Sequence, residues 1–292
     1  MFDLLAYGVV ALVLLYCGVL VVLWRFQERV VFQPPSGVAP SAVGAAMVQY
    51  RAADDTPLFA YVVGELTSSA PVMLAFHGNA DLARWLVPWA TRVLRETGCS
   101  VMLPEYRGYD ALSGAPNYRT SALDARAALD YLRTVAHIAP EQLVYFGHSL
   151  GTAIAAELAA GSPPRSLILQ SPFSTARAMA ARMFVPGLTM FWRFVSRVHF
   201  DTLALVRRLD CPVWVAHGDR DTVVPMRMGR EVFAAARHQG ELLIVHGAAH
   251  SNVPDIGGES YWRWLSAAIR GGRDASGDKS TPGYRAEIPP AP

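Results

Sequence analysis

Short, almost wholly apolar runs alternate with helix-type segments through most of this sequence, and few folds accommodate that alternation. A run such as residues 72–76 (VMLAF) offers no polar side chain to solvent, so a strand made from it is buried on both faces. Helices between such strands are typical of the crossover connections in a parallel sheet. The sequence therefore predicts an α/β fold with a mostly parallel central sheet and helices on both faces.

The alternation places the individual elements. Strands are expected at residues 47–50, 58–63, 72–76, 100–103, 142–146, 167–170, 213–216 and 242–245. Helices are expected at residues 82–96, 120–135, 150–160, 226–237 and 260–269. The first two strands can pair as a hairpin across residues 54–57 (DDTP), which are typical turn residues.

The alternation lapses at about residues 172–205, where aromatic and methionine side chains are dense. This insertion is either an extra packing layer or a short lid whose underside lines an apolar pocket. In the second case Phe173, Met183 and Phe184 would bind the substrate. The sequence leaves both interpretations open.

The N-terminal segment is long and apolar. Residues 4–24 carry no charged side chain, and at about 1.5 Å per residue such a helix reaches across a hydrocarbon layer of about 30 Å. A cleaved signal peptide is the competing interpretation, but no basic residue precedes the run, which is longer than a typical signal core. We expect a single-pass membrane anchor. Arg25 and Arg29, which follow it, favour a catalytic domain on the cytoplasmic side.

Composition and the Pro- and Gly-rich segments divide the chain. We expect residues 1–25 to form the transmembrane anchor, 26–45 a linker, 46–270 one folded domain, and the polar residues 271–292 a disordered tail. The formal net charge is only +2, so a nucleic-acid partner is not expected. The 3 cysteines are too few and too scattered for a metal cluster or a disulfide framework.

A candidate nucleophile lies between an expected strand and an expected helix. Residues 147–151 read G-H-S-L-G, a G-x-S-x-G motif in the strand-turn-helix context that makes the motif informative. The turn must be tight, and glycines on both sides leave room for the strand and the helix to approach each other. Ser149 would then present its hydroxyl above the edge of the sheet. The alternative is an ordinary helix N-cap serine.

A serine hydroxyl needs a base that takes its proton and later returns it to the leaving group. His250 lies in residues 247–252 (GAAHSN), just after the last expected strand, where a loop can hold the imidazole over the nucleophile. His77, His148 and His217 lie beside glycines at strand ends, where structural hydrogen bonding explains them better. We expect His250 to be the base.

The imidazole in turn needs a carboxylate, and the chain order Ser, acid, His places that acid between the last two strands. Residues 217–225 (HGDRDTVVP) offer both Asp219 and Asp221. Spacing alone does not choose between them.

The stretch from about residue 43 to residue 269 resembles the α/β-hydrolase superfamily. The apolar leader together with residues 104–109 (PEYRGY) resembles its Bem46-like branch of membrane-anchored hydrolases. In that branch the acid follows a glycine by three positions and precedes a Val-Pro pair, as Asp221 does here. The resemblance therefore favours Asp221. One departure is Asp110, which stands where relatives have glycine, and another is Leu112, which stands where they have serine.

The negative charge that forms on the attacked carbonyl needs preorganised hydrogen-bond donors. One should be the backbone N–H of Leu150, at the start of the helix after the nucleophile. The resemblance assigns the other to the backbone N–H of Asn79, the residue after the His-Gly pair that ends the third strand.

These patterns predict a serine hydrolase that cleaves ester or thioester bonds of apolar acyl substrates through an acyl-enzyme, with no cofactor and no metal. The substrate would be a small-molecule or lipid-acyl ester. An acylated protein is a further candidate partner, because the Bem46-like branch includes depalmitoylating enzymes. Two alternatives are a catalytically silent, membrane-tethered binding or scaffold module and a serine peptidase.

Overall fold

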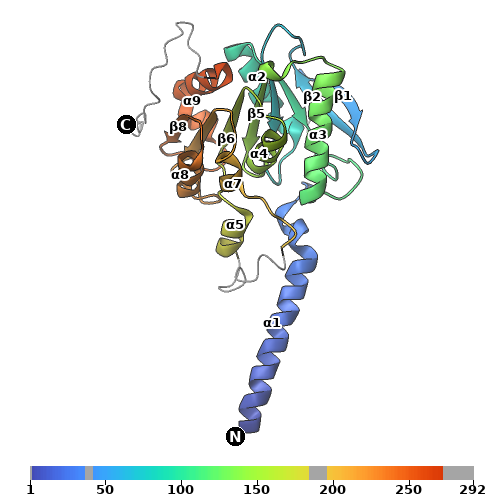
Figure 1. Ribbon diagram of the computed structural model, residues 1–292, viewed down its shortest axis with the longest axis vertical. Helices are drawn as coiled ribbons and strands as arrows, with labels where there is room; N and C mark the ends of the chain where they lie inside the picture. The colour runs from blue at the N-terminus through green and yellow to red at the C-terminus, as the bar shows by residue number, and fades with distance from the viewer. Residues whose placement is uncertain (1, 37–41, 184–195, 272–292) are drawn as a thin grey trace.

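An 8-stranded sheet in the order β1-β2-β4-β3-β5-β6-β7-β8 forms the centre of the molecule (Figure 1). The computed structural model describes residues 2–36, 42–183 and 196–271. β1 pairs with β2 and β2 with β4 in antiparallel register, whereas the remaining pairs are parallel. The strands are β1 (Ala46–Arg51), β2 (Pro57–Val63), β3 (Val72–Phe76), β4 (Ser100–Pro104), β5 (Leu143–His148), β6 (Ser166–Gln170), β7 (Val213–Gly218) and β8 (Gln239–Val245).

Helices cover both faces of this sheet, which confirms the α/β-hydrolase fold that the sequence predicted. The described helices are α1 (Phe2–Val31), α2 (Val87–Thr97), α3 (Tyr118–Thr134), α4 (Leu150–Gly161), α5 (Ala176–Met183), α7 (Thr202–Val206), α8 (Met226–Ala235) and α9 (Val253–Arg270), with 3-10 turns η1 (Ala83–Leu86) and η2 (Pro140–Gln142). The expected hairpin is present, with Arg51 opposite Pro57. The helix expected at residues 82–96 is divided between Leu86 and Val87 into η1 and α2, and Pro88 lies in the first turn of α2.

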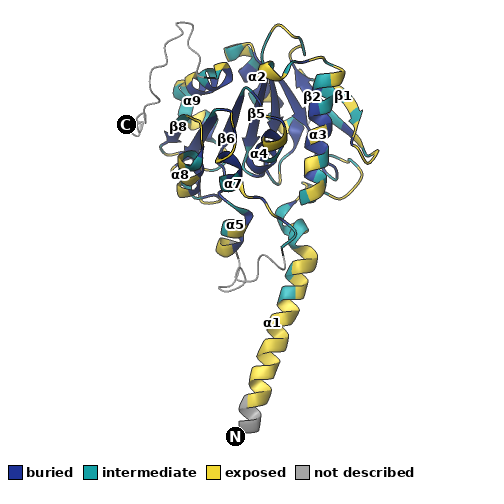
Figure 2. Ribbon diagram, in the orientation of Figure 1, coloured by how far each residue is buried: buried dark blue, intermediate teal, exposed yellow. Residues whose placement is uncertain are grey.

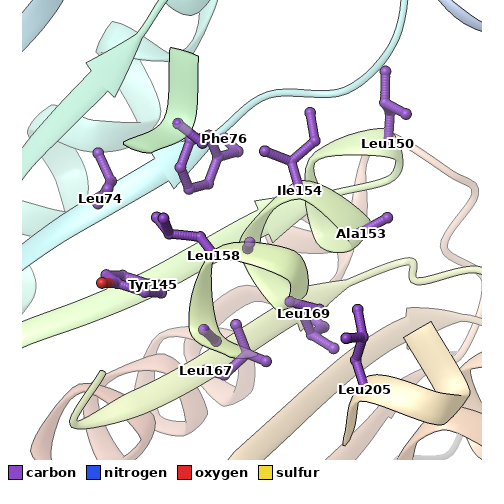
Figure 3. Packing of buried hydrophobic residues seen from close by; sticks show 14 of the residues in the cluster. Leu74, Phe76, Tyr145, Leu150, Ala153, Ile154, Leu158, Leu167, Leu169 and Leu205 are labelled. Carbon is purple, nitrogen blue, oxygen red and sulfur yellow. The ribbon is translucent and has the colours of Figure 1, made fainter. Parts of the chain in front are cut away.

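Each central strand contributes side chains to two separate cores. In β5, Leu143 and Tyr145 belong to a core with α3, α4 and α8, whereas Val144 and Phe146 belong to a core with α2 and α9. This division follows from the two-residue period of a strand. Figure 3 shows the first core, where Ile154 and other α4 side chains pack onto the strands. Burial on both faces is the reason that these strands are predominantly apolar.

The insertion after β6 is described in part. α5 follows β6, Thr175 forms an isolated antiparallel bridge with Asp201, and the Asp201 carboxylate caps α7 by accepting the Ala204 N–H at 2.9 Å. Figure 1 places α5 at the end of the domain where α1 joins it. Phe184 lies outside the described residues, and so does most of the apolar stretch that follows it.

The N-terminal helix α1 is long and apolar enough to cross a bilayer. Its most apolar window, within Ala6–Val31, has a mean hydropathy of 2.6 with none of it buried, and Figure 2 shows the helix exposed along most of its length. The helix continues to Val31, through residues that the sequence suggested as a linker. Phe32, directly after it, is 3% exposed and packs in the α4-side core. Helix α1 is therefore followed directly by a residue of the folded domain's core.

Candidate active site

The turn between β5 and α4 holds Ser149 in an unusual backbone conformation. Its φ of 52° and ψ of −115° lie in a region that a non-glycine residue enters at a cost of about 1–3 kcal/mol. The Ser149 N–H donates to the Gln170 carbonyl on β6 at 3.0 Å, and the Ser149 carbonyl accepts from the Thr152 N–H at 3.0 Å. The turn is thus fixed on both sides, and the Ser149 side chain makes no cap hydrogen bond to α4.

The two glycines of the motif are required by close backbone contacts. A Cβ on Gly147 would overlap the Gly151 carbonyl, and a Cβ on Gly151 would overlap the Phe76 carbonyl of β3. Strand β5, helix α4 and strand β3 therefore meet with no space for a side chain. This is the packing that the sequence predicted for a G-x-S-x-G turn.

The candidate acid and the candidate base meet where the loops after β7 and β8 come together. His250 Nδ1 lies 2.7 Å from Asp221 Oδ2, although the two residues are 29 positions apart. The loops are joined by their backbones, because the Arg220 N–H donates to the Ala248 carbonyl at 3.0 Å. A Cβ on Gly218 would overlap that same carbonyl, so a glycine is needed where the loops cross. The His250 side chain is 14% exposed, and the Asp221 side chain is fully buried.

Asp221 is held as a carboxylate. Burial alone would raise its pKa, but hydrogen bonds from His217 and His250 outweigh burial and hold the pKa below its ordinary value. Its second oxygen accepts the backbone N–H groups of Val223 at 2.9 Å and Val224 at 2.8 Å. A carboxylate with this many donors is rigid and stays ionised at neutral pH. It can therefore fix the His250 tautomer and stabilise an imidazolium.

Asp219 has a different partner. Its carboxylate lies 2.7 Å from His246 Nδ1 and accepts the Gly247 N–H at 2.7 Å. Burial alone would raise the pKa of Asp219, but the hydrogen bonds from His246 and Gly247 outweigh burial and hold the pKa below its ordinary value. The structure thus pairs Asp221 with His250 and gives Asp219 the role of closing the turn before His250.

The two residues expected to supply oxyanion donors flank Ser149. Asn79 follows β3 and lines the same cavity as Ser149 and His250. Leu150 is the first residue of α4, so its N–H has no acceptor within the helix. A Cβ on Gly78 would come within 3.4 Å of the Ser149 side chain, which shows how closely the loop after β3 approaches the nucleophile.

A cavity of about 430 Å³ opens at Ser149 and His250. One wall is aromatic: Trp85 and Trp89, one helical turn apart, project from η1 and α2, and the Trp89 ring lies 4.5 Å from that of Phe146. The start of α9 also lines the cavity, through Pro254. The remaining lining residues are Asn79, Ala80, Asp81, Leu86, His148, Gln170, Ser251 and Asp255.

The substrate residues expected in the insertion lie elsewhere or are not described. Phe173 is buried, its ring lies 6.3 Å from that of Phe200, and it is not among the residues that line the cavity. The side chain of Met183 and the whole of Phe184 lie outside the description. Reasoning from the sequence missed the Trp85 and Trp89 wall. The only trace of it in the sequence is two tryptophans at helical spacing after Asn79, a spacing that is equally typical of core residues.

His148, the variable residue of the G-x-S-x-G motif, lies against the base. Its ring centroid is 5.1 Å from that of His250, and its Nε2 is 3.2 Å from the His250 carbonyl. Burial and the neighbouring His250 lower the pKa of His148 to about 4. A neutral His148 can donate from Nε2 to that carbonyl, which helps to hold the loop of the base.

The departure from the family pattern at Asp110 has a local explanation. Asp110 adopts a φ of 45°, which glycine would adopt without strain. Its carboxylate accepts from Arg84 Nε at 2.6 Å and from the Tyr61 hydroxyl at 3.2 Å. Asp110 therefore ties the loop after β4 to η1, which carries the Trp85 side of the cavity wall.

Comparisons with known proteins identify the family to which this fold belongs. The family described as alpha/beta hydrolase fold matches residues 71–194. A Mycobacterium tuberculosis protein of unknown function is 32% identical over 257 residues, which cover 86% of this chain and 90% of the relative. Lysophosphatidylserine lipase ABHD12 of Danio rerio is 32% identical over 195 residues, which cover 60% of this chain and 50% of the lipase.

Solved structures share the fold. An esterase of Pyrococcus furiosus, Pf2001, superposes with a TM-score of 0.63 at 18% identity, covering 81% of this chain and 98% of the esterase. The esterase RhEst1 of Rhodococcus sp. ECU1013 gives a TM-score of 0.60 at 17% identity, covering 77% of this chain and 98% of RhEst1. At these identities the likeness shows the fold alone.

Proposed function

The chain belongs to the α/β-hydrolase family, in the Bem46-like branch, and we propose that it is a serine hydrolase that cleaves carboxylic ester or thioester bonds of apolar acyl substrates. One observation carries the proposal. Ser149, in a strained turn, lines the same cavity as His250, and His250 Nδ1 lies 2.7 Å from the buried Asp221 carboxylate.

In the first step of the proposed reaction, His250 takes the proton of the Ser149 hydroxyl as its oxygen attacks the substrate carbonyl. The tetrahedral intermediate collapses when the imidazolium gives that proton to the leaving alcohol or thiol, which leaves an acyl group on Ser149. Water then attacks this acyl-enzyme with His250 again as base. The acid is released, and the serine hydroxyl is restored.

The developing oxyanion would be stabilised by the backbone N–H groups of Asn79 and Leu150. Removal of one such donor costs about 10²–10³ in kcat in known hydrolases, so the pair is a large part of the proposed catalysis. The start of α4 adds the positive end of the helix dipole at the same place.

An apolar acyl group is favoured by the aromatic wall of Trp85 and Trp89. A substrate held in a membrane is favoured by the anchor, because Phe32 is buried in the catalytic domain only eight residues after Trp24, which is about 12 Å along a helix. The site is thereby held near the headgroup layer, on the side that the sequence suggests to be cytoplasmic. The Danio rerio relative is a lysophosphatidylserine lipase, which favours a lipid ester for this chain also.

The test is hydrolysis of p-nitrophenyl esters of graded acyl length by the purified full chain and by Ser149→Ala. We expect wild type to turn over the esters and Ser149→Ala to lose at least about 10³-fold in kcat. Equal hydrolysis by both proteins would remove Ser149 from the mechanism. No hydrolysis by either would favour a catalytically silent scaffold.

A further inference from the structure

The end of the membrane anchor is built into the catalytic domain. Phe32 is 3% exposed, and its ring lies 6.5 Å from that of Phe200, which in turn lies 4.9 Å from that of Tyr118. Earlier in α1, the Gln27 side chain accepts the Arg197 N–H at 2.7 Å. These contacts fix both the position and the rotation of α1 where it meets the domain.

Gln33, the residue after Phe32, contacts the loop that carries the candidate oxyanion donor Asn79. The backbone N–H of Gln33 donates to the Asn79 side-chain oxygen at 2.7 Å, across 46 residues of sequence. The same oxygen accepts the Tyr109 hydroxyl at 3.1 Å. Asn79 is therefore held from two directions, once by the anchor and once by a fully buried tyrosine.

Tyr109 belongs to a segment, residues 105–109 (EYRGY), that the proposed chemistry does not use. Its ring packs 5.5 Å from that of His77, and the Tyr106 hydroxyl donates to the His77 carbonyl at 2.9 Å. Glu105 contacts His77 Nε2 at 2.8 Å and accepts the Ala83 N–H at 3.0 Å. The 105–109 segment thus contacts the His77–Asn79 loop at His77 and at Asn79, and Gln33 contacts the same loop at Asn79.

We propose that the docked end of α1 and Tyr109 are positioning elements for the Asn79 N–H, so that the membrane anchor is a working part of the catalytic site. This inference rests on the proposed function. When the anchor end is displaced, Ser149, His250 and Asp221 keep their contacts, but the Asn79 side chain loses one of its two hydrogen bonds. The backbone N–H beside it is then less well aligned with the oxyanion, which lowers kcat more than it raises KM.

The donor at Gln33 is a backbone group, which provides a matched pair of variants. Gln33→Pro removes the N–H, whereas Gln33→Ala keeps it and removes only the side chain. Both are compared in the full detergent-solubilised chain on a short p-nitrophenyl ester, a water-soluble substrate that needs no access through the membrane. We expect kcat of Gln33→Pro to be about tenfold below that of Gln33→Ala, with KM changed less than threefold.

A double-mutant cycle with Asn79→Ala tests the route of the effect. Asn79→Ala keeps its own backbone N–H but removes the oxygen that Gln33 holds, so adding Gln33→Pro to it should lower kcat no further. A fluorophosphonate counts the folded sites, because the final extent of Ser149 labelling is independent of turnover. If Gln33→Pro reduces the extent of labelling, Tyr109→Phe is the test in its place. Tyr109→Phe removes only the hydroxyl that donates to the Asn79 oxygen, and it should lower kcat about tenfold.

The outcomes separate this inference from the proposed function. Wild type without label on Ser149 would end both. If wild type is labelled on Ser149, two results would overturn the anchor coupling alone. One is an equal kcat for Gln33→Pro and Gln33→Ala at full labelling, and the other is an unchanged kcat in Tyr109→Phe.

Discussion

Replacing Asp221 by asparagine tests the arrangement of acid and base. Asp221 Oδ2 faces His250 Nδ1 at 2.7 Å, and its other oxygen accepts two backbone N–H groups, from Val223 and Val224. An asparagine can satisfy the two backbone donors only with its oxygen, so its NH₂ group must face His250. The imidazole then has to present an unprotonated Nδ1 and carry its proton on Nε2. In that tautomer it cannot accept the Ser149 proton.

The expected loss is therefore large and specific to the chemical step. A wrong tautomer costs about 10³–10⁴ in kcat, which is about 4–5.5 kcal/mol of transition-state stabilisation. Asp219→Asn is the matched control, since it lies two residues away and contacts His246 in place of His250. Its kcat should remain within a few-fold of wild type.

The assay is p-nitrophenyl ester hydrolysis by the three proteins, with thermal unfolding measured on each to establish that they are folded. Asp221 does not act on the His250 tautomer if folded Asp221→Asn keeps more than a tenth of the wild-type kcat, or if Asp219→Asn loses more activity than Asp221→Asn.

Three further predictions follow from the packing and the charges. Gly151→Ala should lower the free energy of unfolding by about 1–3 kcal/mol, because its Cβ would overlap the Phe76 carbonyl. Gly161→Ala, whose Cβ meets nothing within 4 Å, should leave the free energy of unfolding nearly unchanged, and thermal unfolding compares the two variants. The pKa of His148 is lowered from 6.5 to about 4 in the folded protein, so the unfolded chain takes up a proton first as the pH falls. Between pH 6.5 and pH 4, wild type should therefore lose about 1–3 kcal/mol more free energy of unfolding than His148→Gln does. Denaturant titrations at pH 7 and pH 4 that give equal losses would contradict this. Trp85→Ala should lower kcat/KM for long acyl esters about tenfold and leave the acetyl ester nearly unchanged; a uniform change would remove Trp85 from the acyl wall.

Much of the fold was predictable because its signals are local. The run at residues 143–146 is wholly apolar, and the strand formed there is buried on both faces, so composition alone indicated a central strand. The G-x-S-x-G turn was predictable for a related reason. Two glycines are needed where three backbones meet, and that requirement is visible at fixed spacing in the sequence.

The choice between Asp219 and Asp221 was not local. Both follow the end of β7, and the difference lies in which histidine of the following loop each one contacts, His246 or His250. The resemblance to a family favoured Asp221 where spacing alone did not, and the geometry pairs that residue with His250.

The cavity wall and the anchor contact were missed for physical reasons. Trp89 packs against Phe146 as well as lining the cavity, so its position at helical spacing indicated only a core residue. The hydrogen bond from Gln33 to Asn79 uses a backbone N–H, which every residue except proline has. Such a contact leaves no signature in the sequence, and it becomes visible only when the end of α1 is placed against the domain.

Whether Ser149 is an activated nucleophile can be measured by the intact mass of the full chain after reaction with a fluorophosphonate, followed by mapping of the modified peptide. We expect one adduct per chain, on Ser149, and none on Ser149→Ala. A wild-type chain that stays unmodified, or an adduct on another residue with Ser149 free, would contradict it.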